Sequence, residues 1–211
     1  MNLARIEQAA NDAGLAQVGA FHPDDPDIGT LVLFAPAADF WARLTDAPEY
    51  RGDDPVDRWS ARVFAMLADQ LDARAILPFG GPPYAPFLDY AKQSGRAWNS
   101  HVGMLIHDQF GLMISYRGAL AFNERFDLPA TPRQSPCETC IPKPCATACP
   151  VHALTPSGYD VPKCKEYLRS NPKNDCMSQG CAVRRACPMS AGAKRDAAQS
   201  AHYMRVFRGN E

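Results

Sequence analysis

All eight cysteines of this 211-residue chain lie in one stretch near its C-terminal end, between Cys137 and Cys187. Thiolates are soft ligands, and clustered cysteines bind zinc or iron–sulfur clusters or take part in redox chemistry. Disulfides are disfavoured in a reducing compartment, so a disulfide scaffold would require export. The first 136 residues contain no cysteine. We therefore expect a metal-binding or redox region that follows a region of a different kind.

The first four cysteines follow the pattern Cys137-x2-Cys140-x4-Cys145-x3-Cys149-Pro150. Bacterial ferredoxins carry C-x2-C-x2-C-x3-C-P, in which three cysteines bind one 4Fe–4S cluster and the cysteine before proline binds the other. The middle spacing is two residues longer in this chain. The pattern predicts that Cys149 binds a different cluster from the three cysteines that precede it.

The last four cysteines are spaced more widely, as Cys164-x11-Cys176-x4-Cys181-x5-Cys187-Pro188. This set also ends in Cys-Pro, so we expect its last cysteine to bind the cluster that the first set mainly holds. Two 4Fe–4S clusters then use every cysteine. The predicted ligands of the first cluster are Cys137, Cys140, Cys145 and Cys187. The predicted ligands of the second cluster are Cys149, Cys164, Cys176 and Cys181.

Other interpretations of the cysteines stay open at this point. Structural zinc also takes four cysteines, usually from two C-x2–4-C knuckles separated by a longer loop, and two Cys-Pro endings fit that pattern poorly. A single cluster with spare cysteines is consistent with the irregular spacing of the second set. A disulfide scaffold requires an oxidising compartment.

Charge is distributed unevenly along the chain. Residues 1–132 carry 10 Lys and Arg against 17 Asp and Glu, whereas residues 133–211 carry 12 against 6. The basic residues are scattered among the cysteines, so we do not expect a nucleic-acid partner. Two 4Fe–4S clusters with thiolate ligands, at a formal charge of about −2 each, would offset about four of these positive charges. Near the N-terminus there is no apolar run of membrane-spanning or signal-peptide length, so we predict a cytoplasmic protein without a membrane partner.

Hydrophobic periodicity before the cysteines predicts alternating helices and strands. The expected helices are residues 2–14, 37–44, 55–72 and 87–94. The expected strands are residues 16–21, 30–36 and 73–79, followed by a hairpin of 102–107 and 112–122. This order predicts the α+β class, with a mixed sheet and packed helices over residues 1–128. A linker at 129–136, a ferredoxin-like domain at 137–190 and a C-terminal tail at 191–211 complete the expected organisation.

From about residue 95 to residue 188, the chain resembles the epoxyqueuosine reductases, a family related to the corrinoid-dependent reductive dehalogenases. The segment GRAW (95–98) is similar to the family's Gly-Leu-Gly-Trp, and MLIHDQFG (104–111) is similar to its apolar strand and aromatic-Gly turn. The segment CKEYL, which begins at Cys164, is similar to the family's Cys-Ile-Ser-Tyr-Leu. The N-terminal GLAQVGAF (14–21) also resembles the family's opening strand.

The resemblance implies a nitroreductase-like fold for the N-terminal domain, a cobalamin held there, and two clusters that supply it with electrons. The catalytic signature of the family is not present in this chain. Ser100-His101-Val102 stands where the family has Gly-Lys-Asn or Gly-Lys-His, and FGGPPYAPF (79–87) has no carboxylate where the family has its general-acid Asp.

Two functional hypotheses follow. One is an iron–sulfur oxidoreductase whose clusters relay electrons to a cofactor or a small-molecule substrate, with a corrinoid as the first choice of cofactor and a flavin as the second. The other is a non-catalytic, ferredoxin-type electron carrier or cofactor-handling module that acts on a redox partner protein. The missing carboxylate favours the carrier, and the large N-terminal domain favours the oxidoreductase.

Three residues that precede the cysteines are candidates to line a cofactor pocket. His101 and His107 flank a predicted strand at even spacing, so their side chains could lie on the same side. Histidine titrates near neutral pH, and either residue could donate a proton. Tyr84 lies in the Gly-Pro-rich loop and could form a pocket wall. The alternative for each residue is a structural role, and no catalytic residue is assigned.

Overall fold

The computed structural model describes residues 2–155 and 158–209. The chain forms two compact units, which we call the first unit (Met1–Arg96 with Ser115–Arg133) and the second unit (Ala97–Ile114 with Gln134–Glu211). Both helices and strands are present, which confirms the α+β class. The division differs from the expected boundaries, because residues 97–114 fold with the cysteine region and not with the N-terminal sheet.

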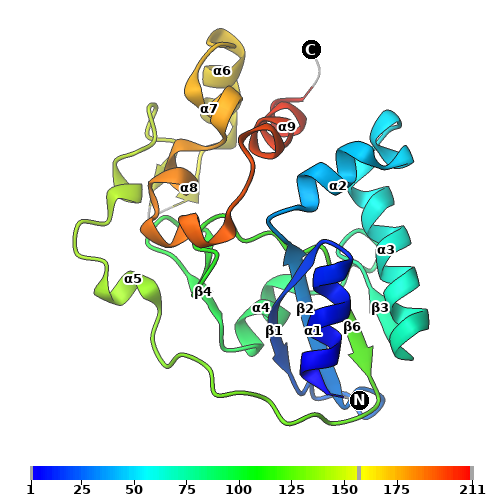
Figure 1. Cartoon of the computed structure of the whole chain (residues 1–211). Helices are drawn as coiled ribbons and strands as arrows, with labels where there is room; N and C mark the ends of the chain where they lie inside the picture. Colours follow the sequence, from blue (N-terminus) through cyan, green and yellow to red (C-terminus); the bar gives the residue numbers. More distant parts are fainter. Residues whose placement is uncertain (1, 156–157, 210–211) are drawn as a thin grey trace. The chain divides into compact units, whose positions relative to one another are not determined.

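A four-stranded sheet forms the centre of the first unit (Figure 1). Its strands are β1 (Leu15–Phe21), β2 (Thr30–Pro36), β6 (Gly118–Phe122) and β3 (Arg74–Ile76), in that spatial order. We expected a mixed sheet, but every neighbouring pair is antiparallel. Antiparallel order needs no crossover helix between strands, so β1 and β2 pair directly across one loop.

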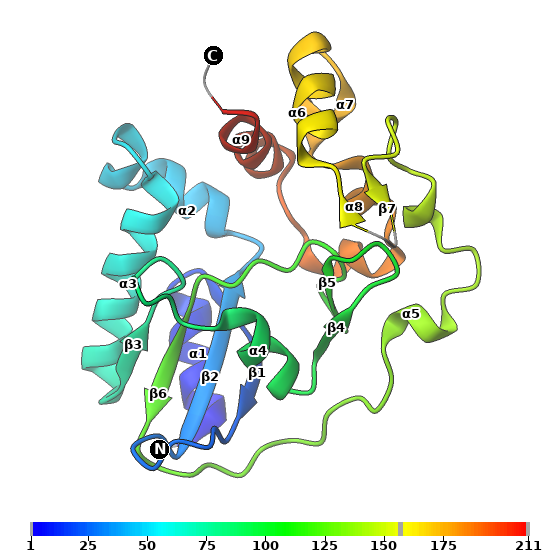
Figure 2. The ribbon, with the colours of Figure 1, turned by 180° about the vertical axis from the view of Figure 1, so that it is seen from behind.

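The two central strands of this sheet are buried along their whole length. All residues of β2 and β6 are buried, which explains why both are continuous apolar runs without polar alternation. Such strands need cover on both faces. Helix α1 (Leu3–Asp12) lies in front of the sheet in Figure 1, and α4 (Phe87–Gln93) lies in front of it in the reverse view of Figure 2.

Helix α3 (Pro55–Leu71) provides much of the core of the first unit. It packs beside α1, and its fully buried Phe64 lies against the backbone of β6. A Cβ atom at Gly118 of β6 would come within 2.7 Å or less of ring atoms of Phe64, so only glycine allows this approach. The Phe64 ring also meets Phe34 of β2 edge-on, at 5.9 Å between centroids. The apolar stripe of α3 therefore sets where β2 and β6 lie beneath it.

The expected hairpin of residues 102–107 and 112–122 is wrong. Strand β5 (Leu105–His107) pairs with β4 (Ala97–Asn99) in the second unit, whereas β6 joins the sheet of the first unit. The apolar run from Leu112 is shared between two cores, because the chain passes from the second unit to the first after Ile114. Hydrophobicity marks these residues as buried, but it does not say in which core.

Two short helices, α2 (Phe40–Asp46) and η1 (Pro48–Arg51), precede α3. In η1, the buried Glu49 accepts two hydrogen bonds from Arg62 of α3, from Nε at 2.5 Å and from Nη2 at 3.3 Å. A bidentate guanidinium–carboxylate pair is stronger than a single contact. Its hydrogen bonds hold the pKa of the Glu49 carboxyl below 4.5.

We expect this pair to make the first unit sensitive to acid. The folded-state pKa of Glu49 is lowered, so its contribution is present above pH 4.5 and is lost as the pH falls through the folded-state value. Glu49→Gln should therefore reduce the loss of unfolding free energy between pH 6 and pH 3, measured by urea titration. Glu7→Gln, on the exposed side of α1, is the control and should follow the wild type. Equal acid sensitivity in both variants would count against this role.

The second unit consists of short elements. Its helices are α5 (Pro136–Thr139), η2 (Pro144–Ala146), α6 (Val161–Ser170), α7 (Asp175–Gln179), α8 (Ala182–Ala186), η3 (Pro188–Ala193) and α9 (Ala197–Arg208). Besides β4 and β5, the small strands β7 (Leu154–Thr155) and β8 (Gly158–Tyr159) form an antiparallel pair. Helix α9 packs against α6 and α7, so the region expected as a tail contributes a packed helix. None of the described helices is long and apolar enough to cross a membrane.

Candidate metal centres

The eight cysteines gather in two groups within the second unit. Four of them line a cavity of about 390 Å³, which we call the first thiol cavity. These four are Cys137, Cys140, Cys145 and Cys187. The other four line a smaller cavity of about 20 Å³, the second thiol cavity. These four are Cys149, Cys164, Cys176 and Cys181. All eight are free thiols.

Proline-initiated turns place the cysteines of the first thiol cavity. Helix α5 begins at Pro136, and a capping box formed by Ser135 and Glu138 closes its first turn. The Cys137 N–H donates to Ser135 Oγ at 3.3 Å, and Cys140 follows as the C-terminal cap. Proline at the first helical position has its backbone torsion already set for a helix, which suits such short turns. Similar turns carry the other two cysteines, because η2 contains Cys145 and η3 begins directly after Cys187.

The β4–β5 hairpin forms an apolar wall of the first thiol cavity. Ile106 of β5 and Leu112, just after the hairpin, line the cavity. The backbone of Leu112 is tied to η3 and α8, the two helices on either side of Cys187. Its N–H donates to Ser190 Oγ at 3.1 Å, and its carbonyl accepts from Arg184 Nη1 at 2.9 Å. Gly111 has a φ of +54°, and a Cβ there would collide with the backbone of Ser190. The wall is therefore fixed by backbone contact.

Helices supply most of the second thiol cavity. Cys164 lies in α6, Cys176 lies in α7, and Cys181 caps the N-terminus of α8. Cys149 lies three residues after the end of η2 and is buried. Side chains from α6, α9 and α8 close the cavity with Leu168, Met204 and Val183. The cavity has room for about one water molecule by volume, so it would have to widen around a four-iron cluster.

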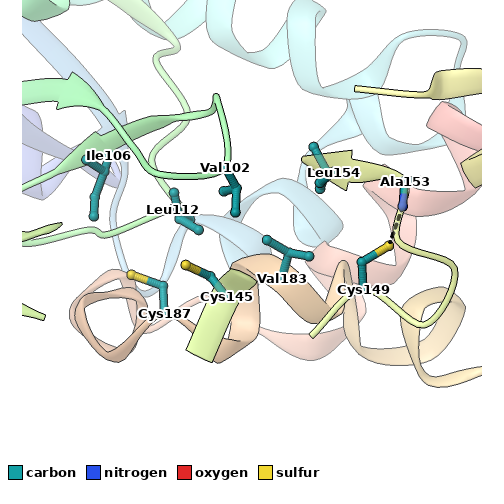
Figure 3. Packing of buried hydrophobic residues seen from close by; sticks show 9 residues of the cluster. All are labelled: Val102, Ile106, Leu112, Cys145, Cys149, Ala153, Leu154, Val183 and Cys187. Carbon is teal, nitrogen blue, oxygen red and sulfur yellow. Dashed lines mark hydrogen bonds between the residues drawn. The ribbon is translucent and has the colours of Figure 1, made fainter. Parts of the chain in front are cut away.

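Hydrogen-bond donors reach the sulfurs of the second thiol cavity. The Ala153 N–H donates to Cys149 Sγ at 3.2 Å (Figure 3). The Ala182 N–H and the Tyr159 hydroxyl similarly interact with the thiols of Cys176 and Cys164. Donors of this kind stabilise negative charge on sulfur and tune the electronic properties of a bound metal. At Cys164 and Cys176 these donors offset part of the burial that disfavours charge on the sulfur.

Burial raises the pKa of the thiols of Cys145, Cys164 and Cys176. Negative charge on nearby cysteines raises these pKa values further. In each case the contributing cysteines line the same cavity as the affected thiol. Cys145 is affected by Cys187, Cys137 and Cys140. Cys164 is affected by Cys181, Cys149 and Cys176. Four thiolates brought this close repel one another, so they need a cation among them to stay deprotonated.

An apolar core separates the two thiol cavities. Figure 3 shows Val183 of α8 between Cys145 and Cys187 on one side and Cys149 on the other. Helix α8 has five residues and therefore spans about 7.5 Å, with Cys181 before its start and Cys187 after its end. The stretch from Cys145 to Cys149 makes a second connection between the sites. Each connection carries one cysteine of each set.

The three other candidate residues differ in burial and are divided between the two units. His101 is exposed and lines the first thiol cavity. His107 is fully buried, and its Nδ1 accepts hydrogen bonds from the N–H groups of Gln109 at 3.1 Å and Phe110 at 3.3 Å, which is typical of a structural histidine. Tyr84 belongs to the first unit and is 65% exposed.

Two residues near the sulfurs were not anticipated from the sequence. Ser100 lines the first thiol cavity, and Tyr159 approaches Cys164 of the second. Isolated serine and tyrosine residues carry no motif, so only the packing of the hairpins β4–β5 and β7–β8 reveals them. Within residues 2–155 and 158–209, no three His, Cys, Asp or Glu side chains form a group arranged to hold a metal ion.

Comparison with known proteins gives no identification. No protein-family model matches the chain, and no curated protein is significantly similar to it.

Proposed function

We propose that the second unit binds two 4Fe–4S clusters and transfers single electrons between redox partners. The first thiol cavity would hold one cluster through Cys137, Cys140, Cys145 and Cys187. The second would hold the other through Cys149, Cys164, Cys176 and Cys181. When bound, each cluster supplies a one-electron redox centre.

The observation that carries this proposal is the crossed grouping of the cysteines. Neighbours in sequence would place Cys149 with the three cysteines before it, but Cys149 lines the second thiol cavity. Cys187 instead joins the first, about forty residues after Cys145. This exchange is the arrangement that bacterial two-cluster ferredoxins show. Two separate zinc knuckles would not require it.

The donor sets and their surroundings suit iron–sulfur clusters. Each site offers four thiols, the ligand set of a 4Fe–4S cluster. The first thiol cavity, at about 390 Å³, has far more space than a single ion with thiolates at about 2.3 Å would need. The apolar residues Val102, Ile106 and Leu112 form one buried cluster with Cys145 and Cys187. Helix α8 keeps the two sites a short and fixed distance apart, which suits electron transfer between them.

The narrow second thiol cavity favours one alternative, a protein that binds a cluster in the first thiol cavity alone. The two forms differ in stoichiometry. Two clusters require about eight irons and eight sulfides per chain, whereas one cluster requires about four of each.

All eight proposed ligands belong to the second unit, so an electron carrier needs no ligand from the first unit. A corrinoid, or else a flavin, in the first unit is a further proposal that rests on the resemblance of residues 95–188. In that case the protein would be an oxidoreductase acting on a small molecule. Titration of the protein with cobalamin and with flavin mononucleotide, monitored by absorption, tests whether the first unit binds a cofactor. If neither binds, the electron-carrier function remains.

The decisive experiment is anaerobic purification of the full chain with iron, acid-labile sulfide and zinc analysis. We expect about eight irons and eight sulfides per chain, and a visible absorption band that is bleached by dithionite. About four of each would establish the one-cluster form. Stoichiometric zinc without sulfide, after reconstitution with iron and sulfide has been attempted, would overturn the proposal.

A further inference from the structure

The side chain of Ser100 is a buried polar group at the wall of the first thiol cavity. The residue is 8% exposed and follows β4, at the start of the turn that leads to β5. Its backbone is fully engaged, since its N–H donates to the Met104 carbonyl at 2.8 Å and its carbonyl accepts from the Gly103 N–H at 3.1 Å. Its hydroxyl is different. Among the residues that the structure describes, Ser100 Oγ has no hydrogen-bond partner.

A buried hydroxyl without a partner has lost its hydration and gained nothing in return, so such groups are rare in folded proteins and call for an explanation. A serine hydroxyl can donate one hydrogen bond and rotates to suit its acceptor. The first thiol cavity is lined mainly by apolar side chains and by four cysteines. Its other polar lining residues are His101, Thr139 and Lys143, and none of them forms a hydrogen bond with Ser100 Oγ. Sulfur that carries negative charge is therefore the acceptor that this cavity would provide.

We propose that the Ser100 hydroxyl donates a hydrogen bond to the iron–sulfur cluster of the first thiol cavity and raises its reduction potential. This inference rests on the proposed function. Reduction adds an electron to the cluster, and a hydrogen bond to its sulfur stabilises the added charge. Ser100 is then a tuning residue, and the cysteines remain the ligands. The second site obtains comparable donors from Ala153, Ala182 and Tyr159.

The test compares Ser100→Thr with Ser100→Val in the full, cluster-loaded chain. Threonine and valine have nearly the same shape, but only threonine retains the hydroxyl. We expect wild type and Ser100→Thr to agree in dithionite titrations followed by electron paramagnetic resonance. In Ser100→Val, the reduction potential of one cluster should fall. At a given applied potential, the ratio of reduced to oxidised cluster should be about tenfold lower, which equals a shift of about 59 mV for one electron. Ser60→Ala, which removes a buried hydroxyl from α3, should leave both potentials unchanged.

A second measurement does not depend on potential. Resonance Raman Fe–S bands should shift between H2O and D2O to a smaller extent in Ser100→Val than in Ser100→Thr, because one exchangeable hydrogen bond is lost. Clusters that are present but have equal potentials and equal isotope shifts in both variants would overturn this inference alone. A wild-type chain that binds no sulfide would overturn the proposed function, and the inference with it.

Discussion

Replacing Cys145 and Cys187 together by alanine is expected to leave about four irons per chain, whereas replacing Cys145 and Cys149 together should leave almost none. The reason is the crossed grouping. Cys145 and Cys187 line the same cavity, so the double variant disables one site, while Cys145 and Cys149 line different cavities and their double variant disables both. Iron and sulfide analysis after anaerobic reconstitution measures the result.

The two double variants distinguish the crossed grouping from one in which each cluster uses four consecutive cysteines. If each cluster used four consecutive cysteines, Cys145→Ala with Cys149→Ala would retain about four irons and Cys145→Ala with Cys187→Ala would retain none. The two variants carry equal numbers of substitutions, so general damage to the second unit would affect both alike. Circular dichroism of each variant provides the check on folding. A reversed pattern of iron content would contradict the proposed ligand sets.

Replacing Phe64 by alanine is expected to cost about 3–5 kcal/mol of the unfolding free energy of the first unit. Phe64 is fully buried, packs edge-on against Phe34 and lies directly against Gly118. Its truncation leaves a cavity between α3 and the two central strands, and the tight backbone of these strands cannot collapse into it. Urea denaturation followed by the fluorescence of Trp41 and Trp59, both in the first unit, measures the change.

Met66→Ala is the matched control, because Met66 lies on the same helix but is 47% exposed. Its replacement should change the unfolding free energy by less than about 0.5 kcal/mol, as expected for a surface position. The iron content of both variants should remain at the wild-type value if the two units hold their folds independently. A cost below about 1 kcal/mol for Phe64→Ala would contradict the central role of α3 in the core.

Most elements of the first unit could be predicted because their signals are local. Strand β2 was expected at residues 30–36, where the structure places it, since it is a continuous run of apolar residues between turns. Helix α3 was expected over 55–72, and the structure ends it one residue earlier. It could be predicted because Pro55 marks its start and the spacing of its apolar side chains is helical. Strand direction and pairing could not be predicted in this way. They depend on residues far apart in sequence, as the separation of β5 from β6 shows.

The sequence by itself determined the type and spacing of the candidate ligands. The number, spacing and Cys-Pro endings of the cysteines predicted two sets of four ligands, because thiol type and short-range spacing are written directly in the chain. Only the tertiary structure decided what surrounds them. It places residues 97–114 with the cysteines and makes Ser100 and Leu112 part of a cavity wall. It also buries His107, whose ring accepts hydrogen bonds from the turn that follows it. These outcomes depend on which distant surfaces pack together, and packing energy depends on the shape of the whole fold.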